Sequence, residues 1–263
     1  MKNRECRQKS YVLPLFLSLL AAIFILGACT TPEKAKANHV ARGQALLKDK
    51  KFQEAVLEFR SALQIDDKLA EAHWGLANAY EGLQRYQEAF EEMRATASLD
   101  PNHLDARVKL GNYYLVGAKH SSAALGEAER LAKEVLDKDP NHIEGHILMG
   151  GVLFAQDKKQ EAFAELNRAI ELNPQRVESY LSLARFHVLT NDIATAEATY
   201  QRAISVSGGS AMAHYEYGKF LVGAQRIDEA EAAFQKAIQV EPSNRDARFI
   251  IADRKSTRLN SSH

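Results

Sequence analysis

The stretch AEAHWGLANAYEGLQRYQEAFEEMRATASLDPNH, residues 70–103, reads as two helices joined by a short turn and closed by a proline. Numbered from Ala70 as position 1, positions 4, 7, 8 and 11 follow an i, i+3, i+4, i+7 spacing and share one helical face. Positions 20, 24 and 27 share a face of the second helix in the same way. The stretch therefore predicts a helical hairpin whose two inner faces pack together.

The same pattern returns in six consecutive units, which span residues 36–69, 70–103, 104–142, 143–176, 177–210 and 211–244. Positions 8 and 20 are Gly or Ala in every unit, with Ala128 as the shifted position 20 of the third, and small side chains let two helices approach closely. Proline stands at position 32 in four units, where it ends the second helix: Pro101, Pro140, Pro174 and Pro242. The third unit has 39 residues, and we expect its five surplus residues near 118–125, in the turn between its helices.

These offsets and the period of 34 resemble the tetratricopeptide repeat (TPR) family. The resemblance implies an all-α, right-handed superhelical solenoid of helix-turn-helix repeats, in which stacked hairpins bury a continuous core. The alternative, an unrelated helical bundle, would not keep small residues and prolines in phase over six units.

The N-terminus predicts a lipoprotein signal. Basic residues open the chain, residues 11–26 are mostly apolar, and Leu26-Gly27-Ala28-Cys29 resembles the bacterial lipobox. The resemblance implies cleavage after residue 28 and diacylation of Cys29, with residues 29–35 as a tether. The alternative, a transmembrane anchor, is disfavoured because the apolar run is shorter than the roughly 20 residues that span a bilayer. Two acyl chains give stable anchoring, and Thr30 favours the outer membrane, facing the periplasm.

Composition is that of a folded protein, with 46% hydrophobic and 26% charged residues. Without the first ten and last eleven residues, 27 basic residues stand against 32 acidic ones, a net charge near −5. This acidic balance gives no electrostatic reason to expect nucleic acid as a partner. The two cysteines, Cys6 and Cys29, lie outside the repeats, so no disulfide framework is predicted.

The C-terminus predicts the start of a seventh repeat at residues 245–252, after which the pattern stops. Residues 253–263, DRKSTRLNSSH, match one translated frame of a common sequencing-library adapter, so we expect a non-native tail and a natural protein that continues with more repeats. The alternative is a genuine polar tail.

No catalytic, metal or cofactor site is predicted, and we expect the protein not to be an enzyme. Position 4 is histidine in four repeats, at His39, His73, His146 and His214, but these side chains face the inside of separate hairpins. Successive copies lie too far apart to share a zinc ion. The chain has no HExxH, GxSxG or P-loop motif.

The resemblance implies a concave groove lined by positions 2, 5, 9 and 12 of the first helices. Along the six repeats, the side chains at position 5 form an apolar stripe, and those at position 9 form a mostly polar row beside it. This combination suits an apolar segment or helix of a partner. The predicted groove residues are Trp74, Asn78, Asn112, Ile147, Leu181, Arg185, Tyr215 and Lys219. Trp74 and Tyr215 are the expected hot spots. The alternative for the stripe is packing between adjacent repeats. Position 5 lacks the lysines with which some relatives clamp a carboxylate.

We expect a membrane-tethered protein–protein interaction scaffold of the bacterial cell envelope. Its partners would be other envelope proteins or peptides, and the membrane through lipidated Cys29. The alternative is a holdase-like chaperone or a pilotin-type factor for secretin, pilus or exopolysaccharide export machinery. A third alternative is an enzyme domain in the missing C-terminal part of the natural protein, after residue 252.

Overall fold

The computed structural model describes residues 31–119, 121–206 and 208–261, and within them it holds thirteen α-helices and no strand. The predicted signal peptide and the lipidation site Cys29 lie outside the described residues. In the part that is described, no helix is both long and apolar enough to cross a bilayer.

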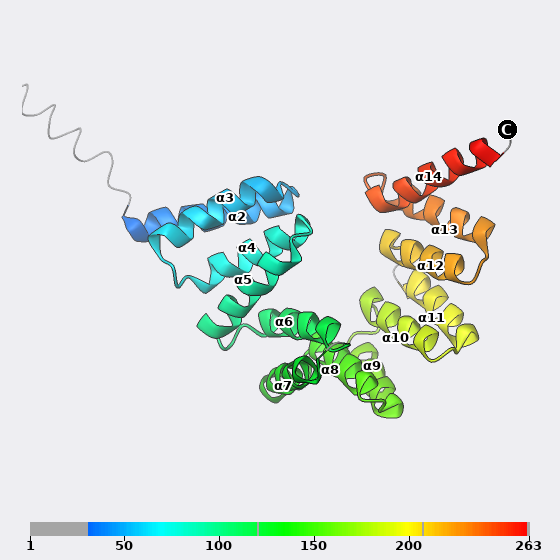
Figure 1. The fold of residues 1–263 in the computed structure, drawn as a ribbon, viewed down its shortest axis with the longest axis horizontal. Coiled ribbons are helices and arrows are strands. Elements are labelled where there is room, and N and C mark those ends of the chain that lie inside the picture. The colour runs from blue at the N-terminus through cyan, green and yellow to red at the C-terminus, as the bar shows by residue number, and fades with distance from the viewer. Residues whose placement is uncertain (1–30, 120, 207, 262–263) are drawn as a thin grey trace, which may run out of the picture. The chain divides into compact units, whose positions relative to one another are not determined.

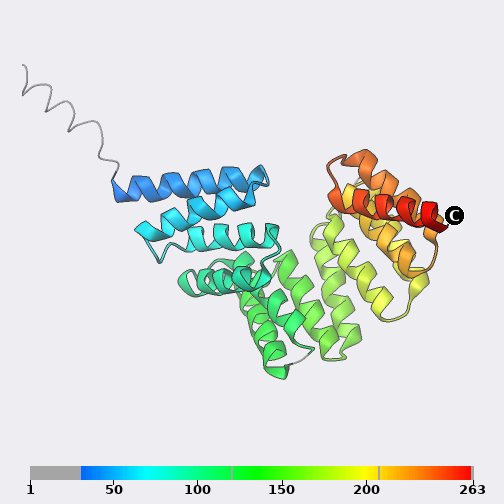
Figure 2. The same ribbon diagram turned by 45° about the horizontal axis from the view of Figure 1, so that its top comes forward.

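The described residues form two compact units, divided between Asp100 and Pro101. The first holds α2 (Pro32–Lys48), α3 (Phe52–Ile65), α4 (Ala70–Gly82) and α5 (Tyr86–Leu99). The second holds α6 (Leu104–Gly117), α7 (Ser122–Lys138), α8 (Ile143–Ala155), α9 (Lys159–Leu172), α10 (Val177–Leu189), α11 (Ile193–Val206), α12 (Ala211–Gly223), α13 (Ile227–Val240) and α14 (Arg245–Ser261). Within each unit the helices stack as antiparallel hairpins, as Figures 1 and 2 show. The predicted all-α repeat fold is confirmed.

The turn inside a hairpin is built by a residue in the left-handed conformation. Five non-glycine residues at position 15 have φ between 57° and 62°: Lys50, Gln84, Asp157, Asn191 and Gln225. After α4, the Gln84 amide donates to the Glu81 carbonyl and the Arg85 amide to the Tyr80 carbonyl, each at 2.9 Å. These two bonds satisfy carbonyls that the helix end leaves open, which offsets the strain of a positive φ.

The core depends on a size match between positions 8 and 24. A Cβ added at Gly43 would lie 2.7 Å from the Phe59 ring, and one added at Gly218 would lie 2.7 Å from Cε1 of Phe234. Glycine at position 8 therefore makes room for phenylalanine at position 24. Where position 24 holds another large side chain, position 8 can be alanine, as in Ala77 with Met93 and Ala184 with Tyr200. All four of these side chains are buried.

In the third hairpin the surplus residues lie near 118–125, as expected, but most of them extend the start of α7 instead of lengthening the turn. Its second helix, α7, has 17 residues where α5, α9, α11 and α13 have 14. Its first helix, α6, has one residue more than α4, and its turn covers four positions, 118–121. Most of the surplus thus extends a helix, whose added residues keep their backbone hydrogen bonds, and only one residue lengthens the turn.

Both ends of the array are more helical than the sequence suggests. The predicted tether is helical from Pro32, because a proline in the first turn needs no amide partner and Thr31 Oγ1 accepts from the Lys34 amide at 3.3 Å. At the other end, α14 continues through the predicted tail to Ser261, a stretch with no glycine or proline to stop it. Ala252, at position 8 of this helix, is exposed.

Candidate partner-binding surface

In the first unit, the predicted groove residues are Trp74 and Asn78 on α4. Both are half-buried, and they are joined by a hydrogen bond in which Asn78 Nδ2 donates to the Trp74 carbonyl at 2.7 Å. The amide is thus used within its own helix. At position 5 of α2, Val40 is only 5% exposed and belongs to the core.

In the second unit, the structure corrects the role of Leu181. Its side chain is 1% exposed and packs in the same cluster as Ala184, Tyr200 and Leu221, so it cannot contact a partner. Val108, at the same position of α6, is 4% exposed. For Val40, Val108 and Leu181 the alternative explanation holds, since apolar side chains at position 5 are drawn between adjacent helices. Ile147 and Tyr215 stay half-buried, and Asn112 is exposed.

Three predicted residues come together around one carboxylate, Glu216 of α12. Arg185 of α10 places Nη2 3.2 Å from Glu216 Oε2, and Lys219 places Nζ 3.2 Å from Glu216 Oε1. Lys219 Nζ also lies 5.5 Å from the centroid of the Tyr215 ring, a cation–π arrangement. The Glu216 side chain is 13% exposed, whereas those of Arg185 and Lys219 are about half exposed. We call these four residues the Arg185–Lys219 cluster.

The chemistry of this cluster suits binding. Two cations surround one acid, so the cluster carries one net positive charge. Burial raises the pKa of the Tyr215 hydroxyl, with further contributions from Asp246 and Glu216, so the hydroxyl stays protonated at neutral pH and can donate a hydrogen bond. The cluster therefore presents donors and an aromatic ring to an approaching chain.

Sequence reasoning missed a side-chain contact between positions 4 and 23 of the same hairpin, which recurs in three hairpins. The Nδ1 atom of histidine meets a glutamate Oε2 in three hairpins: His39–Glu58 at 2.7 Å, His73–Glu92 at 2.5 Å and His146–Glu165 at 2.5 Å. His73 Nε2 also lies 3.1 Å from the Asp67 carbonyl, so both ring nitrogens face oxygen acceptors, an arrangement that favours the imidazolium form. The hydrogen bond to Glu92 is the main cause that raises the His73 pKa.

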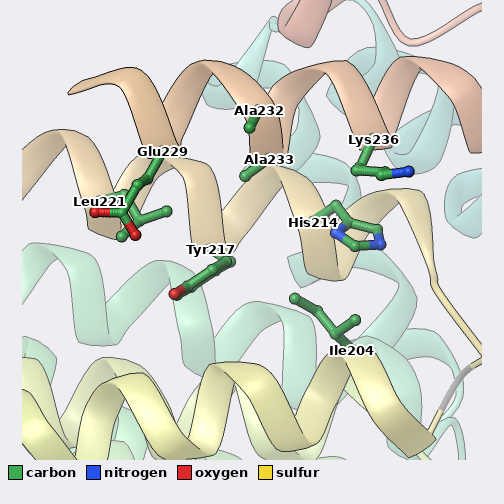
Figure 3. Close-up of a pocket in the computed structure, with 8 residues that line it drawn as sticks. All are labelled: Ile204, His214, Tyr217, Leu221, Glu229, Ala232, Ala233 and Lys236. Carbon is green, nitrogen blue, oxygen red and sulfur yellow. The ribbon is translucent and has the colours of Figure 1, made fainter. Parts of the chain in front are cut away.

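The sixth repeat has the histidine without the glutamate. Position 23 there is Ala233, and a pocket of about 330 Å³ opens beside His214, lined by residues of α11, α12 and α13 (Figure 3). The signal in the sequence was that the other three repeats with histidine at position 4 have glutamate at position 23, Glu58, Glu92 and Glu165, whereas this repeat has alanine. Among the described residues, no group of three or more His, Cys, Asp or Glu side chains could hold a metal ion.

Family models described as TPR or tetratricopeptide repeat match residues 43–84, 70–103, 120–185, 177–208 and 218–253. These matches recur on the same helical hairpins that the structure stacks in each unit. The protein is a tetratricopeptide repeat protein. The TPR fold implies protein or peptide partners, and proteins of this fold typically act as interaction scaffolds.

This TPR protein is similar in part to a protein O-mannosyl-transferase. It is 27% identical over 160 residues to the Homo sapiens protein O-mannosyl-transferase TMTC3; the match covers 56% of this chain and 17% of that protein. The chain thus spans about a sixth of that relative's length.

Solved structures share the fold. A tetratricopeptide repeat protein from Parabacteroides merdae superposes with a TM-score of 0.70 at 19% identity, over 90% of this chain and 89% of that chain. PilW, described as a widely conserved type IV pilus biogenesis factor, superposes with a TM-score of 0.58 at 17% identity, over 83% of this chain and 99% of that chain.

Proposed function

We propose that this TPR protein is a membrane-tethered scaffold of the bacterial cell envelope, anchored by lipid on Cys29, whose repeats hold a segment of another envelope protein. The observation that carries the proposal is the Arg185–Lys219 cluster. It combines a half-buried tyrosine with two half-exposed cations on neighbouring first helices, α10 and α12. Aromatic and arginine side chains dominate the energetics of protein interfaces.

The preferred partner segment follows from the chemistry of the cluster. Arg185 and Lys219 already share Glu216, so an additional acid from a partner can bond to their remaining donors. The Tyr215 ring offers an apolar surface beside them. We therefore expect an extended or helical segment that carries acidic residues next to apolar ones.

A holdase role is less well supported. A chaperone for unfolded segments needs a continuous exposed apolar surface, whereas three of the six position 5 side chains are buried: Val40, Val108 and Leu181. The scaffold hypothesis needs only a local binding surface. The fold shared with PilW makes pilus assembly one setting in which to look for the partner.

The tether has its own test. Cys29→Ser should leave the precursor unlipidated and abolish acyl labelling, because it removes the thiol that the acyl chains would join. Normal labelling of Cys29→Ser would refute the lipid anchor.

The binding surface is tested by crosslinking and pull-down of the lipidated full chain from its native envelope. Tyr215→Ala should lower recovery of the partner about tenfold or more, as expected for an aromatic hot spot worth about 2 kcal/mol. Arg168→Ala is the matched control, because Arg168 on α9 is a half-exposed cation paired with Glu171 outside the cluster. Equal recovery with Tyr215→Ala and Arg168→Ala would refute the assignment.

A further inference from the structure

The pocket beside His214 occupies the place where other hairpins hold a carboxylate. In the hairpins of His39, His73 and His146, glutamate at position 23 reaches the histidine ring. In the α12–α13 hairpin the equivalent residue, Ala233, is 7% exposed and lines the pocket together with His214. The site therefore keeps one half of a pair that the chain builds three times.

The two ends of the pocket differ in charge. Figure 3 shows His214 and Lys236 together at one end, and Glu229 at the other end near Leu221. The acid at the far end is already paired, because Glu229 accepts from Arg226 Nη2 at 2.6 Å and from Arg226 Nε at 2.8 Å, although Arg226 also bonds to Glu197 at 2.7 Å. The end at His214 and Lys236 presents two basic groups between the apolar side chains of Ile204 and Ala233.

The geometry points to this pocket as a binding site for the carboxylate of a glutamate side chain supplied by a partner protein. The carboxylate would bond to His214 and Lys236, and the two methylene groups of the stem would lie against Ile204 and Ala233. Charge complementarity selects an acid, and Glu58, Glu92 and Glu165 of this chain show which acid fits beside a position 4 histidine.

This site is separate from the surface proposed above. His214, Tyr217 and Leu221 follow an i, i+3, i+7 spacing on α12, whereas Tyr215 and Lys219 lie on another face of the same helix. The inference rests on the proposed function only in that the ligand belongs to a protein. A small-molecule probe tests the pocket without any envelope partner, so its failure and that of the scaffold proposal are distinguishable.

Protonation should be coupled to binding. Burial lowers the pKa of His214, and the charge of Lys236 lowers it further. The titratable groups that line the pocket are Tyr217 from α12 and Glu229 and Lys236 from α13, while α11 contributes the apolar Ile204. A bound carboxylate favours the imidazolium, so binding takes up a proton. Affinity should fall about tenfold per pH unit between the pKa of free His214 and its pKa in the complex.

The experiment is an NMR titration of the full chain with N-acetylglutamate N-methylamide, following the ring protons of His214, which His214→Gln identifies. The neutral glutamine analogue is the matched probe. We expect saturable binding of the glutamate probe, at least tenfold weaker binding of the glutamine probe, and tighter binding as the pH is lowered toward 6. Equal binding of the two probes, or no saturation with either, would overturn the proposal.

Variants locate the site. Ala233→Glu supplies the missing carboxylate from within the chain and should abolish binding of the probe, and an unchanged or higher melting temperature shows that the fold is intact. Lys236→Gln should weaken binding at least threefold, whereas Lys133→Gln, at an exposed cation of α7 outside the pocket and outside the Arg185–Lys219 cluster, should leave it unchanged. Retained binding by Ala233→Glu would place the ligand elsewhere and refute the inference. Tighter binding of octanoate than of the glutamate probe would refute a protein source for the acid.

Discussion

The α4–α5 and α12–α13 hairpins use the same core positions but differ in what lies beside the histidine at position 4. In the first, Ala77 packs with Met93 and His73 is clasped by Glu92. In the second, Gly218 lies against Phe234, and His214 faces Ala233 and a pocket. The comparison teaches that positions 8 and 24 set the packing of a hairpin, whereas positions 4 and 23 set the polar contact beside it. Either pair can therefore change without the other.

The largest effect should come from position 20, which both hairpins share. Ala89 and Ala230 are 0% exposed, so Ala89→Glu and Ala230→Glu would each bury a charge without a partner. Each should lower the free energy of unfolding by about 3 kcal/mol or more, measured by urea denaturation. Gln235→Glu, at an exposed position of α13, is the control and should change little. If either core variant were as stable as the control, the two hairpins would not share a common core position.

A smaller effect should come from the size match. Gly218→Ala forces a Cβ against the buried Phe234 ring, which costs about 1–3 kcal/mol, partly offset by the better helix propensity of alanine. Phe234→Met in the same chain recreates the pair found in α4–α5. A double-mutant cycle should then show that the pair of substitutions is less destabilising than the sum of the single ones. Additive effects would mean that positions 8 and 24 do not compensate each other.

The smallest effect, and the one that separates the hairpins most directly, is the pH dependence of stability. The raised pKa of His73 contributes stability that is fully present below about pH 6.5 and is lost as pH rises through the folded-state pKa. The lowered pKa of His214 has the opposite sign, because protonation below about pH 6.5 favours the unfolded chain.

Replacement by glutamine should reveal these opposite signs. His73→Gln should lose about 1 kcal/mol more at pH 5 than at pH 8, whereas His214→Gln should gain relative to the wild type at pH 5. Free energies of unfolding at several pH values measure both. If the free energies of unfolding of the two variants changed with pH in the same way, the two histidines would not differ in their effect on stability.

The sequence predicted structure well where the effect of a residue depends on its own backbone or on the size of its side chain. Pro101 ends α5 because it has no amide to donate, and Gly218 can only be small because Phe234 stands opposite. The sequence was misleading where a segment can adopt either of two stable conformations. The extra residues of the third repeat fit a longer turn or a longer α7, and hydrogen bonding within the helix favours the second.

The sequence by itself determined the repeat: the 34-residue spacing, the small residues at positions 8 and 20, and the prolines after the second helices each follow from local chemistry. Only the tertiary structure decided which side chains remain accessible. Leu181 and Tyr215 occupy the same position of their repeats, yet one is buried and the other half-buried, because burial depends on the neighbouring helices. The empty place beside His214 likewise exists only where two helices meet without the glutamate that joins them elsewhere.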